Sequence, residues 1–243
     1  MGTSSGLAVV TGGAQGLGEA ISRRLASDGY EVAVLDLDDQ RAKNLAEEIK
    51  GRAVHCDVAD PDAVRAAAAE VGPADVLVNN AGIWFTEPTL DASDEHLQAV
   101  VAVNVLGVLY CCRSFAPGMI EKGAGSIVNI SSGAAKSSSP GYGVYPASKA
   151  AVISLTRQLA LEWGPSGIRV NAIGPGVIQT ERNRANFEGE GGVRRAGYVP
   201  LRRTGVPADI ADVVSALCSH DMRYVSGQII YVDGALSAGV PGI

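Results

Sequence analysis

The segment YPASK, residues 145–149, places a weak acid, Tyr145, four residues before a cation, Lys149. On a helix, side chains at this spacing lie on one face. A free tyrosine has a pKa of about 10, which is too high for a base at neutral pH. A nearby cation favours the phenolate and lowers that pKa. The pair therefore predicts a tyrosine that takes a proton from a substrate and returns it, with the lysine beside it.

Pro146 favours the start of a helix here, because its missing N–H is one that the first turn leaves unpaired. The residue before a proline avoids the helical conformation. Tyr145 therefore lies either at the N-cap or at the first helical position, and the sequence leaves this open. Taken alone, the segment also fits an ordinary helix start with an exposed tyrosine.

A glycine-rich turn, TGGAQGLG at residues 11–18, follows the apolar run at residues 7–10. Apolar residues then recur at helical spacing, at Leu17, Ile21 and Leu25. Glycines between a strand and a helix let the backbone approach a pyrophosphate at the positive end of the helix. A tight turn alone explains the glycines, but the strand before it and the helix after it favour a dinucleotide site.

Asp36 ends the next strand-like run, EVAVLD. A carboxylate at this place accepts hydrogen bonds from the hydroxyls of an adenosine ribose. The extra phosphate of NADP would meet it as a like charge. The neighbouring Leu37, Ala14 and Gln15 are neutral, and Arg41 stands further along the following helix. The sequence therefore predicts NAD as the cofactor, in preference to NADP.

Short β-branched runs alternate with helical patterns along the chain. Strands are expected at residues 7–10, 31–36, 53–56, 75–80, 126–131, 168–173 and 228–232, and helices include 94–119 and 147–163. This alternation predicts an α/β fold, a Rossmann-like doubly wound parallel sheet of about seven strands with helices on both faces. We expect a single domain over residues 1–243, with ligands at the carboxyl ends of the strands.

The segment at residues 180–205 breaks this pattern, because it is rich in glycine and arginine and weakly periodic. Long loops without structure in compact domains are usually functional or disordered, so we expect a lid over the substrate. Four of its arginines are candidates for receiving an anionic group, although a solvated face explains them better. They are Arg194, Arg195, Arg202 and Arg203.

Four motifs follow strand ends in a fixed order: TGGAQGLG, NNAG at residues 79–82, YPASK and GPG at residues 174–176. With them the chain resembles the short-chain dehydrogenase/reductase family, over nearly its whole length. The resemblance implies a nicotinamide dinucleotide cofactor held by five sets of residues. They are Gly12, Gln15, Gly16, Leu17 and Gly18; Asp36 and Leu37; Asp57 and Val58; Asn79, Ala81 and Gly82; and Tyr145, Lys149, Pro175, Gly176, Ile178 and Thr180.

The resemblance also implies the catalytic set Asn104, Ser132, Tyr145 and Lys149. Ser132 is chosen over Ser131 because it stands thirteen residues before Tyr145, the usual spacing of the family. Asn104 would order a water near the lysine, and Lys149 would bond the nicotinamide ribose. The expected substrate contacts are Trp84, Ser132, Tyr142, Tyr145 and Val177, although ordinary packing explains the aromatic residues equally well.

These features favour an NAD-dependent oxidoreductase that moves a hydride between a secondary alcohol, or its ketone, and the nicotinamide. One alternative is a 3-oxoacyl-thioester reductase, and another is a cofactor-binding member without turnover. An epimerase or dehydratase fits less well, because such relatives have another glycine spacing and a larger C-terminal domain.

The net charge of −6 argues against a nucleic-acid partner, since such proteins usually carry a basic face. The longest apolar stretch, residues 99–112, is interrupted by Asn104 and is too short to cross a bilayer, so we expect no membrane association. The start of the chain has no signal-peptide pattern, which favours a cytoplasmic protein. The four cysteines lack metal-binding spacing, so no metal is expected. The resemblance and the apolar faces of residues 94–119 and 147–163 favour a homotetramer.

Overall fold

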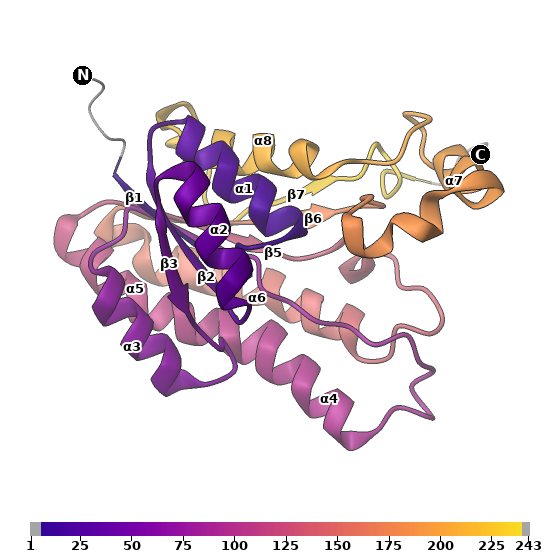
Figure 1. Cartoon of the computed structure of the whole chain (residues 1–243), viewed down its shortest axis with the longest axis horizontal. Helices are drawn as coiled ribbons and strands as arrows, with labels where there is room; N and C mark the ends of the chain where they lie inside the picture. The colour runs from indigo at the N-terminus through magenta and orange to yellow at the C-terminus, as the bar shows by residue number, and fades with distance from the viewer. Residues whose placement is uncertain (1–5, 240–243) are drawn as a thin grey trace.

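The computed structural model describes residues 6–239, which form one parallel sheet of seven strands flanked by helices (Figure 1). The strand order is β3-β2-β1-β4-β5-β6-β7. The strands are β1 (Leu7–Thr11), β2 (Glu31–Asp36), β3 (Arg52–His55), β4 (Val76–Asn79), β5 (Gly125–Ile130), β6 (Ile168–Pro175) and β7 (Ile229–Val232). The predicted doubly wound fold is confirmed, and every expected strand is present.

The order of the strands reverses at β1. The chain runs outward from β1 through β2 to β3, and then crosses back to place β4 on the other side of β1. Helices that follow the two diverging strands leave a crevice beyond their carboxyl ends, where ligands bind in open α/β sheets. The segments that follow β1 and β4 carry the glycine-rich turn and the NNAG motif.

Two layers of helices cover the sheet. The first layer contains α1 (Gly16–Ser27), α2 (Asp39–Ile49) and α8 (Pro207–Cys218), and its core includes Ile21 and Ile210. The second contains α3 (Pro61–Val71), α4 (Asp94–Val101), α5 (Val108–Lys122) and α6 (Tyr145–Trp163), and its core includes Phe115 and Met119. Both faces of the sheet are therefore buried, as a parallel sheet requires.

The helical run from Asp94 to Lys122 is continuous, but its middle, η1 (Ala102–Gly107), is a π-helix. This run is long and apolar enough to span a membrane, and an 18-residue stretch of it has a mean hydropathy of 1.7. Phe115 and Met119 of α5 are buried against the sheet, which is the arrangement of a core helix. The run is longer than the apolar stretch identified in the sequence, because polar residues extend it at both ends.

The segment at residues 180–205 differs from the structureless loop that was expected. It contains η4 (Glu181–Phe187), a 3-10 helix, and α7 (Gly189–Tyr198). Thr180 caps η4, and its backbone N–H donates to Asn183 Oδ1 at 2.7 Å. No residue of η4 or α7 is buried, so the segment lies on the surface at the carboxyl-end side of the sheet (Figure 1).

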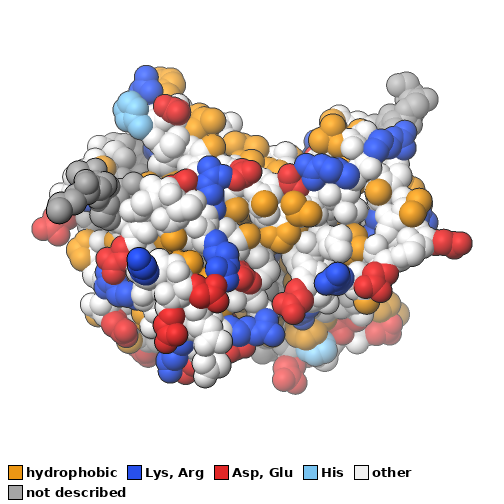
Figure 2. Space-filling model, turned by 45° about the horizontal axis from the view of Figure 1, so that its top comes forward, with side chains coloured by type: hydrophobic (Ala, Val, Ile, Leu, Met, Phe, Trp, Pro, Cys, Tyr) orange, Lys and Arg blue, Asp and Glu red, His pale blue; other side chains and the backbone are white. Residues whose placement is uncertain are grey.

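Acidic and basic side chains are interspersed on the face shown in Figure 2, with hydrophobic side chains gathered between them near its middle. Many of the charges form ion pairs, such as Arg23 with Glu48 and Arg52 with Glu31. Such exposed pairs contribute little stability individually.

Candidate active site

The glycine-rich turn leaves β1 and enters α1 in a conformation that needs its glycines. Gly12 and Gly16 both have a φ of +58°, which side chains rarely adopt. A Cβ at Gly18 would lie 1.9 Å from the carbonyl oxygen of Gly12, so this position of the turn has no room for a side chain. The backbone here is thus free to approach a ligand at the start of α1.

Asn80 ties this turn to the end of β4. Its side-chain amide donates to the carbonyl oxygens of Thr11 and Gly12 at 3.0 and 2.9 Å. In return, Thr11 Oγ1 accepts the backbone N–H groups of Asn80 and Ala81, both at 3.1 Å. Asn80 was not among the residues expected at the site, because the apolar run predicted a strand through residue 80, whereas β4 ends at Asn79.

Asn79 lies elsewhere, because successive side chains of a strand point to opposite faces. It is 1 % exposed, and its amide donates to Asn129 Oδ1 at 2.8 Å and to Cys112 Sγ. Its own Oδ1 is buried without a hydrogen-bond partner within residues 6–239. The Asn79 side chain therefore supports the sheet from the α5 side, whereas Asn80 is the one that joins the glycine-rich turn.

Asp36 ends β2 beside the turn and is 8 % exposed. Its Oδ2 accepts the N–H of Ala14 at 2.9 Å, and its Oδ1 accepts the N–H of Asp38 at 3.1 Å. A carboxylate has about four lone-pair sites, so each oxygen retains one for another donor. Leu37 follows with 59 % of its surface exposed.

Arg41 is closer to this position than its place in the sequence suggested. Its Nη1 donates to Gln15 Oε1 at 3.3 Å, and its Nε lies 3.3 Å from Asp38 Oδ2. The side chain thus bridges α2 and the glycine-rich turn. A cation therefore stands at the rim of the expected adenosine site, with Asp38 partly neutralising it.

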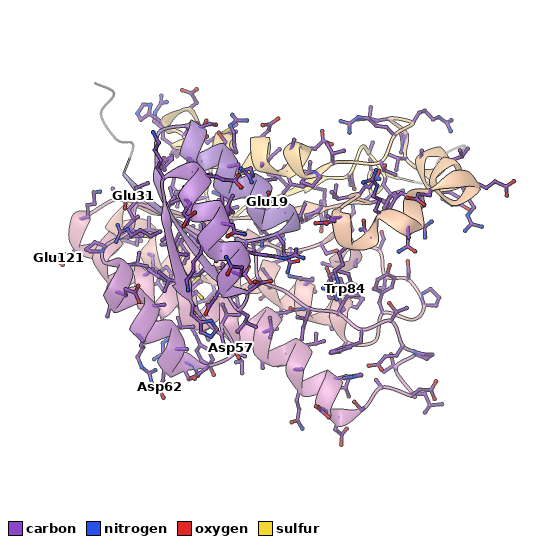
Figure 3. All side chains as sticks on the ribbon, in the orientation of Figure 1. Glu19, Glu31, Asp57, Asp62, Trp84 and Glu121 are labelled. Atoms are coloured by element: carbon purple, nitrogen blue, oxygen red, sulfur yellow. The ribbon has the colours of Figure 1, made fainter. Side chains whose placement is uncertain are left out.

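Three other expected cofactor residues, Asp57, Val58 and Thr180, follow the carboxyl ends of β3 and β6. Val58 is buried against Gly107, and Asp57 accepts the N–H of Ala59 at 2.9 Å. Thr180 Cγ2 lies 3.9 Å from where a Cβ of Gly16 would be, which brings the segment after β6 over the turn. Figure 3 shows Asp57 near β3 and Trp84 near η4, so the two ends of the carboxyl edge of the sheet are well separated.

Tyr145 is the first residue of α6, and Val144 is its N-cap, which answers the point that the sequence left open. Pro146 follows within the first turn, where no N–H is required. Ser132, at the end of β5, is close enough to the phenol to lower its pKa as a hydrogen-bond partner. Ser131 points away, and its Oγ donates to the carbonyl oxygen of Lys149 at 2.8 Å. The structure therefore places Ser132, and not Ser131, beside the phenol.

Lys149 lies one turn along α6 and is 4 % exposed. Its Nζ donates to the carbonyl oxygen of Ile130 at 2.9 Å and lies 5.8 Å from the centre of the Tyr145 ring. Gly82 leaves room for this ammonium group, because a Cβ there would lie 3.2 Å from Nζ. The end of β5 and the NNAG segment together hold the lysine beside the tyrosine.

The pKa shifts of this pair differ from the expectation based on spacing. Burial raises the pKa of Tyr145, the hydrogen bond from Ser132 opposes this, and the neighbouring Tyr142 adds to it. Burial also lowers the pKa of Lys149 to about 8. In the protein without cofactor, the cost of desolvating the phenolate therefore exceeds its attraction to the ammonium group. Tyr145 is held in its protonated form.

Asn104 lies inside the π-helical turn and is fully buried. Its Oδ1 accepts the N–H of Ile83 at 2.9 Å, and its Nδ2 donates to the carbonyl oxygen of Ile83 at 2.9 Å and to Ser148 Oγ at 3.1 Å. A π-helical turn often marks a functional site. Here it directs Asn104 toward the segment after β4 and toward α6. Through its bonds to Ile83, Asn104 positions the segment that carries Trp84.

Two aromatic rings flank the phenol on its open side. The ring centres of Trp84 and Tyr142 lie 6.3 and 6.2 Å from that of Tyr145. Val177 and Ile178 line a cavity of about 320 Å³ between β6, β7 and the segment that starts α8. The structure thus brings Trp84, Tyr142, Ser132 and Tyr145 together.

These residues fit a nicotinamide dinucleotide. The glycine-rich turn excludes side chains where a pyrophosphate would lie, and Asp36 has lone pairs left for ribose hydroxyls. Among residues 6–239, no group of three or more His, Cys, Asp or Glu side chains is placed to hold a metal ion.

The chain is similar to known proteins along nearly its whole length. The family model described as Enoyl-(Acyl carrier protein) reductase matches residues 12–237. A 3-oxoacyl-(acyl-carrier-protein) reductase FabG of Staphylococcus aureus is 37 % identical over 239 residues, covering 94 % of this chain and 97 % of that protein. An L-2,3-butanediol dehydrogenase of Corynebacterium glutamicum is 37 % identical over 254 residues, covering 96 % and 98 %.

Among solved structures, a gluconate 5-dehydrogenase of Burkholderia cenocepacia in complex with NADP and tartrate has a TM-score of 0.92. It is 31 % identical, and the match covers 98 % of this chain and 97 % of that one. The ordered motifs, the sheet and these similarities define a nicotinamide-dependent oxidoreductase that acts on CH–OH groups. The chain belongs to the short-chain dehydrogenase/reductase family.

Proposed function

We propose that this protein oxidises a secondary alcohol, or reduces its ketone, with NAD as the preferred cofactor and Tyr145 as the acid and base. The observation that carries the proposal is the contact between Tyr145 and Ser132 with Lys149 beside them, at the strand ends next to the glycine-rich turn. When bound, the cofactor supplies the carbon that accepts or donates a hydride. The protein supplies the proton transfer and the position of the substrate.

In the oxidation, the phenolate oxygen of Tyr145 accepts the hydroxyl proton of the substrate, and in the reduction its O–H returns that proton. Ser132 hydrogen-bonds the reacting oxygen and holds it at the phenol. The ammonium group of Lys149 stabilises the phenolate while it exists. Trp84 and Tyr142 cover the open side of the phenol and exclude water from it.

Asp36 supports NAD over NADP, because its carboxylate stands where a ribose phosphate would come. Arg41 at the rim opposes this preference in part, since it brings a positive charge to the same side. The exposed Leu37 adds no charge. The balance favours NAD, with Arg41 as the source of residual activity with NADP.

A second candidate is a 3-oxoacyl-thioester reductase, favoured by the 37 % identity to a reductase of that kind. Acetoacetyl-CoA as substrate distinguishes the two, since the second candidate reduces it faster than any free ketone. In either case we propose a cytoplasmic homotetramer, on the strength of the family. We also propose that residues 180–205 form a lid on a single catalytic domain.

The test is a steady-state assay of nicotinamide absorbance with a panel of secondary alcohols and ketones. Tyr145→Phe should bind NADH as the unmodified protein does and lose turnover by about 10²-fold or more, the range of general acid–base catalysis. Tyr142→Phe serves as the matched control and should retain most of the turnover. Near-normal turnover in Tyr145→Phe would remove the basis of the proposal.

A further inference from the structure

Arg182 of η4 lies over the ring that covers the catalytic tyrosine. Its guanidinium carbon is 4.6 Å from the centre of the Trp84 ring, and that ring lies 6.3 Å from the ring of Tyr145. Figure 3 shows Trp84 beyond the carboxyl ends of the strands, next to the ribbon of η4. A guanidinium from the segment after β6 and a phenol from α6 thus contact the same indole.

Other arginines of this segment are already engaged. Arg195 donates to the carbonyl oxygens of Asn186 and Gly191, and Arg202 donates to that of Gly197. Arg203 forms two hydrogen bonds with Asp209, at 2.7 and 2.8 Å. These arginines hold the segment together, so three of the four candidates selected from the sequence are accounted for structurally.

The side chain of Arg182 makes no hydrogen bond or ion pair with any residue in the described range 6–239; its contact is with the indole face. An indole positions a guanidinium through its ring electrons and leaves the N–H donors free. A guanidinium with free donors matches a carboxylate in two parallel hydrogen bonds. Glu87, three residues after Trp84, has its carboxylate paired with His96 Nδ1 at 3.0 Å.

We infer that Arg182 binds a carboxylate of the substrate while Tyr145 meets its hydroxyl or keto oxygen. The substrate class is therefore a short hydroxy acid and its keto acid. This inference rests on the proposed function, because it names the substrate of the same site. Trp84 positions the guanidinium of Arg182 relative to the phenol of Tyr145, since its indole contacts both.

Matched substrates that differ in charge test this inference. One pair is 3-hydroxybutyrate and 1,3-butanediol, and a longer pair is 4-hydroxypentanoate and 1,4-pentanediol. In the unmodified enzyme, kcat/KM should favour the acid of at least one pair. Arg182→Met should lower kcat/KM for that acid by about tenfold to a hundredfold, mainly through KM, as for a hydrogen bond to a charged group. It should change the diol by less than about threefold.

Two controls separate charge from packing. Arg182→Lys keeps a cation and should restore part of the activity with the acid. Arg184→Met removes an exposed arginine of the same helix and should leave both substrates unchanged. An equal loss for acid and diol in Arg182→Met would show a packing role, and a rise confined to the KM of NAD would place the arginine on the cofactor. Either result overturns the inference, as does an unmodified enzyme that prefers both diols.

A binding measurement separates this inference from the proposed function. Calorimetry of the hydroxy acids with the NAD complex of Tyr145→Phe detects the carboxylate contact without turnover. Binding that weakens about tenfold or more when Arg182→Met is added supports the inference even if no alcohol is oxidised. Equal binding with and without Arg182 refutes it even if the enzyme is an active dehydrogenase.

Discussion

At the scale of single residues, burial decides the chemistry of the Tyr145 and Lys149 pair. Their spacing on a helix was visible in the sequence, and so was the attraction between phenolate and ammonium. The degree of burial was not visible, because it depends on strands and loops that are distant along the chain. Ile130 and Gly82 enclose Lys149, whose burial lowers its pKa, and the burial of Tyr145 itself raises the tyrosine pKa, against the expected direction.

Lys149 should therefore destabilise the protein while it serves the reaction. Its pKa is about 8 in the fold against 10.5 as a free group, which corresponds to roughly 3 kcal/mol. The penalty is complete below pH 8 and is relieved as the pH rises toward 10.5, because the unfolded chain then binds more protons than the folded one. Lys149→Met should raise the free energy of unfolding at pH 7 by an amount that shrinks by pH 10. It should also abolish turnover.

Urea unfolding of both proteins at pH 7 and pH 10 measures this difference. Lys122→Met, which removes an exposed lysine on α5, controls for the loss of charge. A stability gain from Lys149→Met that is the same at both pH values would exclude burial of the ammonium group as its cause.

Cofactor preference is also decided at single residues. Two unit charges about 4 Å apart repel by roughly 1 kcal/mol in water and about 4 kcal/mol near a protein surface. This corresponds to about fivefold to nearly a thousandfold in preference for NAD. Asp36→Ala with Leu37→Arg should shift the ratio of kcat/KM values toward NADP. Arg41→Met should lower the remaining activity with NADP and leave that with NAD nearly unchanged.

The backbone bonds of Asp36 require a companion variant, since Asp36→Ala leaves the buried N–H of Ala14 and the half-buried N–H of Asp38 without an acceptor. Asp36→Asn with Leu37→Arg keeps an acceptor oxygen while removing the charge. Leu37→Arg alone measures the contribution of the added cation. The interpretation of Asp36 is wrong if the unmodified enzyme uses NADP as efficiently as NAD.

At the scale of elements, the sequence predicted the strands and missed two helical features. Strand positions followed from apolar runs, and the bounds differ by no more than two residues at either end. The π-helical turn at Asn104 was not predicted, because one extra residue in a turn leaves the apolar pattern nearly unchanged. Helix α7 was missed because its glycines, including Gly191 and Gly192, have low helix propensity.

Helix α7 and η4 should be the least stable elements of the site. Neither contains a buried residue, and local stability follows buried contacts. Amide hydrogen exchange of residues 181–198 should be fast in the protein alone and slow when NAD and a substrate are bound together. Helix α8, with Ile210 and Val214 buried, should stay protected in both states. Equal exchange of residues 181–198 with and without ligands would argue against a lid.

At the scale of the whole molecule, the exposed apolar side chains point to further association. Leu161 on α6 is 76 % exposed, and Leu106 and Ile120 on the adjoining helical run are 38 % and 41 % exposed. These helices lie in the layer that covers one face of the sheet, so their outer sides are available to a second copy (Figure 1). Burying apolar surface of this kind stabilises association at about 25 cal/mol per Å².

We therefore expect a homotetramer, with a sedimentation mass near four times the 24.9 kDa of one chain. Leu161→Glu should lower that mass, because it places a charge in the apolar face of α6. Leu90→Glu is the matched control, since Leu90 is 95 % exposed in the segment between β4 and α4, and the mass should not change. A mass of one chain for the unmodified protein would contradict the tetramer, whereas a dimer insensitive to Leu161→Glu would move the interface away from α6.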